Sequence, residues 1–148
     1  RGGGRMTLIG IDPGMNTGAA EYREGRLVAV ATIKPHRIGA MLEAVKPALV
    51  VFEDSRLQSH VWTLAKTHAA VAKIGRNVGM VDAWCHLIEA ECERLGIECI
   101  GVSPKDKGGK LDAQAFATVT GWQGRTNEHE RDSAMVAWPY RRALHVQK

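Results

Sequence analysis

Short apolar runs separated by turn residues occupy the first part of the chain. The runs cover residues 6–11, 19–22 and 27–33, and glycine-containing turns stand between them. Runs of this kind are typical of β-strands, and strands joined by short turns pair with their neighbours in the chain. The pattern therefore predicts an antiparallel meander.

A continuous apolar run at residues 49–52 has a different character. It lies between Pro47 and the charged pair Glu53-Asp54 and shows no alternation of polar and apolar positions. Such a run predicts a strand that is buried on both faces, near the centre of a sheet. Residues 38–45, just before it, carry apolar side chains at helical spacing and predict a short helix.

Helical patterns dominate the remaining chain. Helix, helix, strand and helix are predicted in turn at residues 60–74, 81–95, 97–102 and 111–119. A last helix is predicted to begin near Asn127, which forms a capping-box pattern with Glu130, and to cover residues 132–146. Pro139 should kink this helix or end it early. The order of elements predicts an α/β domain with a mixed sheet.

The size and composition restrict the class of protein. A chain of 148 residues with 45% hydrophobic and 24% charged residues suits one globular domain, and no apolar run is long enough to cross a membrane. Residues 1–5 have no apolar segment typical of a secretory signal, so we interpret them as an expression leader before a natural start at Met6. Residues 6–148 then form the single domain. The net charge of +4 is compatible with a polyanionic partner.

The cysteines do not indicate a metal or disulfide framework. Cys85, Cys92 and Cys99 are odd in number and lack C-x-x-C spacing. They are expected to be buried thiols in a reducing, cytoplasmic compartment.

Acidic residues stand where two predicted strands end. Asp12 follows the first strand in the stretch IGIDPGMNTG, and Glu53 follows the buried strand. If these two strands are neighbours, both carboxylates lie at the edge where open α/β sheets form their ligand crevice. His129 and Asp132 are three residues apart at the start of the last helix, so they share a helix face and could join the same edge.

Each of these residues also has an ordinary structural interpretation. Asp12 suits a turn, Glu53 suits a solvent-facing strand end, and a capping or surface position suits His129. Asp132 could interact with the helix dipole. The hypothesis of a joint site rests on their combination. Clustered carboxylates need a cation, and oxygen ligands with a histidine suit two Mg²⁺ or Mn²⁺ ions, which favour phosphodiester hydrolysis.

At these residues the sequence resembles RuvC-type Holliday-junction resolvases of the RNase H-like superfamily. The resemblance lies in IGIDPG with Thr17-Gly18, in VFE ending at Glu53, and in HERDSA from His129. A weaker match covers Ser103-Pro104 and the lysines that follow. The resemblance implies an RNase H-like mixed five-stranded sheet flanked by helices. The short length is similar to that of phage-encoded versions.

The resemblance also implies a function and a set of roles. A two-metal endonuclease would act as a homodimer on four-way and other branched DNA, in the cytoplasm of a bacterial or phage-infected cell. Asp12 would bridge the metals, Glu53 and Asp132 would each bind one, and His129 would be a fourth ligand or a phosphate contact. Many relatives carry an acid at the position of His129. Helicase partners stay unknown.

Basic and polar residues beside these segments are candidates for DNA binding. The candidates are Arg56, Gln58, Ser59, His60, Arg76, Lys105, Lys107, Lys110 and Arg125. A solvated loop explains the lysines equally well. Trp62 could stack on a base, although a core or dimer position is the more common one for tryptophan. The stripe around Trp84 and Ile88 suits either the core or a dimer contact.

Two other functions fit parts of the pattern. A branched-DNA-binding module on the same fold would need neither the acids nor a metal. A fragment of an actin-like or sugar-kinase phosphotransferase would share the D-x-G turn, but its second lobe does not fit in 148 residues.

Overall fold

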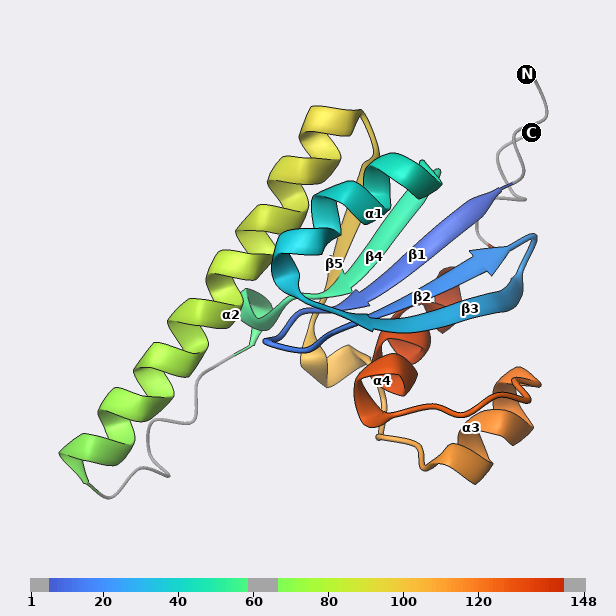
Figure 1. Ribbon diagram of the computed structural model, residues 1–148. Helices are drawn as coiled ribbons and strands as arrows, with labels where there is room; N and C mark the ends of the chain where they lie inside the picture. Colours follow the sequence, from blue (N-terminus) through green and yellow to red (C-terminus); the bar gives the residue numbers. More distant parts are fainter. Residues whose placement is uncertain (1–5, 59–66, 143–148) are drawn as a thin grey trace.

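A computed structural model describes residues 6–58 and 67–142 and contains a five-stranded mixed sheet (Figure 1). The strands are β1 (Thr7–Asp12), β2 (Thr17–Arg23), β3 (Arg26–Ile33), β4 (Leu49–Glu53) and β5 (Glu98–Val102). Their order across the sheet is β3-β2-β1-β4-β5. The predicted five-stranded α/β architecture is confirmed.

The first three strands form the predicted meander, and β4 and β5 extend it in parallel. β1 pairs antiparallel with β2 and parallel with β4, with Ile11 opposite Phe52. The side chains of β4 from Leu49 to Phe52 are buried, as expected of a strand covered on both faces. Because β1 and β4 run in the same direction, their last residues, Asp12 and Glu53, reach the same edge of the sheet.

Helices cover both faces of the sheet, and each face has its own apolar core. α1 (Ile38–Val45) and α2 (His68–Leu95) lie on one face, where Ile38, Leu42 and Ile88 are fully buried. α4 (Glu128–Ala137) and α3 (Ala113–Thr120) lie on the other. The predicted capping box at Asn127 is present, and α4 gives way to a short 3-10 helix, Trp138–Tyr140, that contains Pro139.

α2 differs from the prediction. One continuous helix replaces the two predicted over residues 60–74 and 81–95, and Gly75 and Gly79 lie inside it. A glycine in a helix costs only about 1 kcal/mol, which is less than a helix break needs when the rest of the helix is favourable. Residues 59–66, including Trp62, lie outside the described residues.

The two halves of α2 have different surroundings. Buried residues of the helix begin only at Cys85, and Ile88 and Leu95 belong to the core. The earlier half extends beyond the sheet in Figure 1 and leaves Val71 40% and Met80 39% exposed. Of the predicted stripe, Ile88 is a buried core residue and the half-buried Leu95 packs against the core, and Trp84 and Leu87 are also half-buried.

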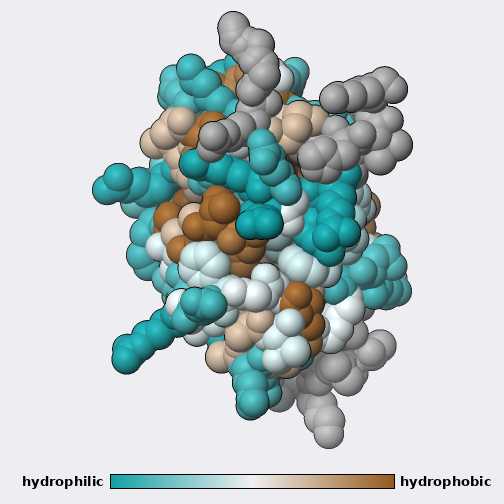
Figure 2. Space-filling model, turned by 90° about the vertical axis from the view of Figure 1, so that its right-hand side faces the viewer, coloured by the Kyte–Doolittle hydropathy of each residue, from teal (hydrophilic) through white to brown (hydrophobic). Residues whose placement is uncertain are grey.

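The β3 side of the molecule carries a second exposed apolar area. Val28 is 43% exposed, and Ala29 and Ala31 are exposed beside it. Figure 2, which faces this side, shows hydrophobic residues gathered among hydrophilic ones. Among the described residues, no helix combines the length and apolar character that a membrane span requires. Cys85 and Cys92 are buried free thiols as predicted, and Cys99 is half-buried.

Candidate active site at the edge of the sheet

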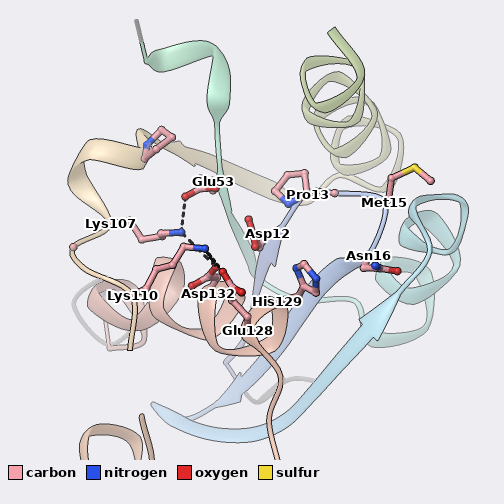
Figure 3. A pocket seen from close by; sticks show the side chains of 13 residues that line it. Asp12, Pro13, Met15, Asn16, Glu53, Lys107, Lys110, Glu128, His129 and Asp132 are labelled. Atoms are coloured by element: carbon pink, nitrogen blue, oxygen red, sulfur yellow. Dashed lines mark hydrogen bonds and ion pairs between the residues drawn. The ribbon is translucent and has the colours of Figure 1, made fainter. Parts of the chain in front are cut away.

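An open pocket of about 530 Å³ lies at the edge where β1 and β4 end (Figure 3). All four predicted catalytic residues line it: Asp12, Glu53, His129 and Asp132. They come from three elements that are far apart in the sequence, namely β1, β4 and α4. The structure therefore brings together the residues that the sequence pattern combined.

Asp12 occupies the inner part of this pocket. It ends β1, and the turn that follows is fixed by Thr17, whose hydroxyl donates to the Gly14 carbonyl oxygen at 2.8 Å. Burial, followed by the nearby charge of Glu53, raises the pKa of Asp12 to about 7. Lys107 acts in the opposite direction. Asp12 therefore keeps its proton at a higher pH than an exposed carboxyl group does.

Two lysines neutralise the acidic cluster. Lys107 Nζ lies 2.7 Å from Glu53 Oε1, and Lys110 Nζ lies 3.3 Å from Asp132 Oδ2 and also pairs with Glu128. The Lys107 side chain is only 9% exposed. Figure 3 shows both ammonium groups pointing towards the carboxylates. The sequence predicted these lysines as phosphate contacts and missed both their position in the pocket and the presence of Glu128.

Close packing of α4 on the sheet places His129 and Asp132. A Cβ atom added to Gly18 would lie 1.9 Å from the His129 carbonyl oxygen, and one added to Gly10 would lie 2.2 Å from that of Ser133. Only glycine permits this approach of helix backbone to strand backbone. As a result, the first turns of α4 rest directly on β1 and β2, and Asp132 is 6% exposed beside the end of β1.

The donor atoms suit a hard divalent cation, but they are not gathered around one point. In the described part of the chain, no three His, Cys, Asp or Glu side chains are placed to hold a single ion. The ammonium groups of Lys107 and Lys110 lie among the carboxylates instead. Carboxylate oxygens and one imidazole match the preferences of Mg²⁺ and Mn²⁺, so the donor atoms of the site fit these ions.

Arg56, predicted as a DNA contact, is held within the protein. Its guanidinium lies 2.7 Å from Asp54 Oδ2 and 2.7 Å from Glu89 Oε1, and it also lies 3.2 Å from His86 Nδ1. These contacts tie the chain after β4 to α2. A DNA contact by Arg56 stays a prediction, and it would require one of these ion pairs to open.

The other predicted DNA-binding residues are spread around the pocket edge and beyond it. Lys105 is exposed in the 3-10 helix Pro104–Asp106, and Arg125 is exposed before α4. Gln58 is half-buried after Ser55–Leu57, and Arg76 is exposed in the outer half of α2. Ser59 and His60 lie outside the described residues.

Comparison with known proteins identifies the fold. No protein-family model and no curated protein sequence matches this chain. The structure of Thermus thermophilus RuvC in complex with a Holliday junction substrate is similar, with a TM-score of 0.62 and 16% identity over 96% of each chain. A second T. thermophilus RuvC structure gives a TM-score of 0.61 and 14% identity over 95% of this chain and 96% of that one. The chain has the RuvC fold, as its sequence motifs predicted.

Proposed function

We propose that this protein is a divalent-metal-dependent endonuclease that resolves four-way DNA junctions and also acts on other branched DNA. The observation that carries the proposal is the meeting of Asp12, Glu53, His129 and Asp132 in one open pocket, on a fold shared with a RuvC structure that contains a Holliday junction. Acidic clusters at this edge of an open α/β sheet are suited to binding phosphate through metal ions.

The pocket residues divide into metal ligands and a phosphate contact. Asp12 would bridge two ions, Glu53 and Asp132 would each hold one, and His129 would be a further ligand or a phosphate contact. Ions held there would activate a water molecule and neutralise the leaving oxygen of the phosphodiester. The raised pKa of Asp12 supports this assignment, because an inner carboxylate crowded by Glu53 gains most from a nearby cation.

Lys107 and Lys110 act as exchangeable counter-charges. Without a bound ion they neutralise Glu53 and Asp132, as their ion pairs indicate. The adjacent Gly108, at φ +83°, and Gly109 give this loop the backbone freedom to turn the ammonium groups away from the carboxylates. Their charges would then meet the phosphates of the bound strand.

The first half of α2, which begins at His68 and ends before Cys85, is the proposed contact for a second copy of the chain. Two symmetric cuts in a four-way junction need two active sites, and a homodimer supplies them. Val71 and Met80 lie exposed on a helix half that packs against no other described element strongly enough to bury a residue. An apolar helix face of this kind is stabilised by pairing with an equivalent face.

The decisive experiment uses a synthetic four-way junction. The purified protein should cut it in Mg²⁺ or Mn²⁺ and leave it intact in EDTA, and Asp12→Asn should bind the junction without cutting. Linear duplex, flaps and Y-forks of the same sequence are the controls for structure selectivity. Intact junctions at every metal concentration, with binding retained, would favour a non-catalytic junction-binding module instead. Sedimentation of the same preparation tests the dimer.

A further inference from the structure

Arg131 stands directly before Asp132 in the motif HERDSA, and the proposed function gives it no role. It belongs to α4 and is half-buried. Its guanidinium Nε donates to the Leu111 carbonyl oxygen at 2.9 Å. One terminal nitrogen, Nη1, donates to the Thr126 carbonyl oxygen at 2.9 Å and lies 3.1 Å from the Thr126 hydroxyl. The donors of this side chain are therefore directed at the protein's own backbone.

The two acceptor residues stand on either side of α3. Leu111 precedes this helix and Thr126 follows it, so Arg131 joins both ends of the intervening segment to α4. Phe116 is buried against the core, whereas most other residues of α3 are exposed. Hydrogen bonds from a charged donor are stronger than neutral ones, and a planar guanidinium can reach two carbonyl groups at once. The guanidinium therefore fixes where the segment leaves α4 and where it returns.

Lys110 is the residue immediately before the anchored Leu111. Residues 108–109 before it are glycines, and in the described part of the chain a Cβ atom added to either would meet nothing within 4 Å. The Lys110 ammonium lies 3.3 Å from Asp132 Oδ2 and also pairs with Glu128, as Figure 3 shows. Because two glycines give the chain freedom on one side, the place of this ammonium depends on the anchor at Leu111 on the other side.

We infer that Arg131 is a positioning residue whose planar guanidinium holds the Lys110 ammonium at the acidic pocket. The inference rests on the proposed nuclease function and deepens it, because it gives a role to a residue that contacts neither the ion nor the DNA. A lysine at this position would keep the positive charge, but its single nitrogen could not reach the Leu111 and Thr126 carbonyl groups in the same geometry. The shape of the guanidinium, and not its charge alone, is what holds the loop.

Hydrogen exchange followed by mass spectrometry tests the attachment without cleavage. Arg131→Lys should speed amide exchange in residues 107–112 by roughly tenfold, and Arg131→Gln, which also removes the charge, should do the same. Exchange in β1 and β4 should stay at the wild-type rate, which shows that the variants are folded. Arg94→Lys is the matched control, because Arg94 pairs with side chains at the end of α2, and it should leave residues 107–112 unchanged. Unchanged exchange there in both Arg131 variants would overturn the inference.

A double-mutant cycle in the junction assay tests whether the attachment acts through Lys110. Arg131→Lys and Lys110→Ala should each slow cleavage at saturating Mn²⁺ by roughly tenfold. The double variant should be no more than about twofold slower than Lys110→Ala alone, because the attachment has nothing left to position.

Two results of the cycle would overturn the role of Arg131. One is a double variant about a hundredfold slower than wild type, since independent losses multiply. The other is wild-type cleavage by Arg131→Lys, which would show that the charge alone is sufficient. Junctions left intact by the wild type would overturn the nuclease instead, and hydrogen exchange would still decide whether Arg131 holds the loop.

Discussion

Glu53 and Asp54 are consecutive acids at the end of β4, and their surroundings are opposite. Asp54 is 4% exposed and accepts hydrogen bonds from the backbone amide and the guanidinium of Arg56. Those bonds hold the pKa of Asp54 below its ordinary value. Glu53 points into the open pocket, beside the carboxyl of Asp12, and its counter-charge is the terminal ammonium of Lys107 on a glycine-containing loop.

The two acids therefore differ in role: the charge of Asp54 stabilises the fold, and under the proposed function the charge of Glu53 serves the active site. The planar guanidinium of Arg56 donates two directed hydrogen bonds to Asp54. An ion or a phosphate in place of either partner would lose these bonds and reduce stability. A single lysine ammonium is a point charge on a flexible stem, and under the proposed function a divalent cation would take its place. The acid with the replaceable partner is the one that faces the pocket. This contrast leads to four predictions, given from the largest expected effect to the smallest.

Removing one charge from each acid should separate the two roles most strongly. Glu53→Gln should lower junction cleavage by roughly 10³-fold or more, because it removes a proposed metal ligand while leaving the shape of the side chain. Asp54→Asn should leave cleavage by the folded protein within about fivefold of wild type, since no part of Asp54 faces the pocket. Cleavage rates at saturating Mn²⁺ measure both. Equal losses in the two variants would contradict the contrast.

Substituting Asp54 should destabilise the fold more than substituting Glu53, which is the reverse of the order expected for cleavage. Asp54→Ala should lower the free energy of unfolding by about 3 kcal/mol, because it leaves the Arg56 guanidinium without its main partner in a mostly buried position. Glu53→Gln should change it by less than about 1 kcal/mol. Urea denaturation followed by circular dichroism compares the two variants with wild type. A Glu53 variant as unstable as the Asp54 variant would mean that Glu53 is also structural.

The position of α4 should depend on the glycine beneath it. Gly18→Ala should lower the free energy of unfolding by about 2 kcal/mol and also reduce cleavage, because the new methyl group meets the His129 carbonyl oxygen and pushes the helix away. Gly79→Ala is the matched control. It lies in α2 with nothing within 4 Å of the added carbon, and it should be neutral or slightly stabilising. Urea denaturation compares the two variants, and the junction assay measures cleavage by Gly18→Ala.

Asp12 and Asp54 should respond to pH in opposite directions. The folded-state pKa of Asp12 is about 7, above the ordinary 3.8, so its ionisation destabilises the fold progressively as pH rises from about 4 to 7. Asp12→Asn should therefore raise the Tm by about 3 °C at pH 8 and leave it unchanged near pH 4. Asp54 stabilises the fold above its ordinary pKa, and this contribution is lost only as pH falls through its lowered value.

A metal titration provides the control for the pH experiment. Mg²⁺ or Mn²⁺ should raise the Tm of the wild type at pH 8 more than that of Asp12→Asn, because the ion relieves the same repulsion that the substitution removes. A gain from Asp12→Asn that is equally large near pH 4 would show that the effect does not come from the charge.

The sequence predicted the parts of the site that depend on topology. Two strands that run in parallel and end in acids place Asp12 and Glu53 together, and a capped helix with H-x-x-D spacing adds Asp132. It did not predict the surroundings of Lys107 and Arg56, because these depend on tertiary contacts. Arg56 lies in the 3-10 helix Ser55–Leu57 and pairs with Glu89 of α2, and Lys107 reaches into the pocket from the loop that follows Pro104–Asp106.

The helix pattern failed for a different reason. Separate helices are predicted at residues 60–74 and 81–95, which leaves Gly75 and Gly79 between them, yet α2 continues through both glycines. Their local cost is small, and the favourable residues around them outweigh it. The early end of the last helix at Pro139 was predictable because proline removes a hydrogen-bond donor and clashes with the preceding turn. In this chain, a proline that sterically excludes a helix is therefore a more dependable sequence signal than a glycine that only weakly disfavours one.

Because α2 is one continuous helix, a small tilt where it packs against the core would move its His68 end much further. At 28 residues it measures about 42 Å, and the portion before Val81, which is the first residue of the helix that packs against the core, extends about 20 Å further. A tilt of about 10° at Val81 would move the His68 end of the helix by about 3 Å, given a helix rise of 1.5 Å per residue. Two contacts fix α2 beside the site. The Ser55 hydroxyl donates to Asp82 Oδ1 at 2.8 Å, and Arg56 forms an ion pair with Glu89. Because Ser55 and Arg56 follow Glu53 almost directly, a displacement of the pocket edge that tilted α2 would be largest at the His68 end of the helix.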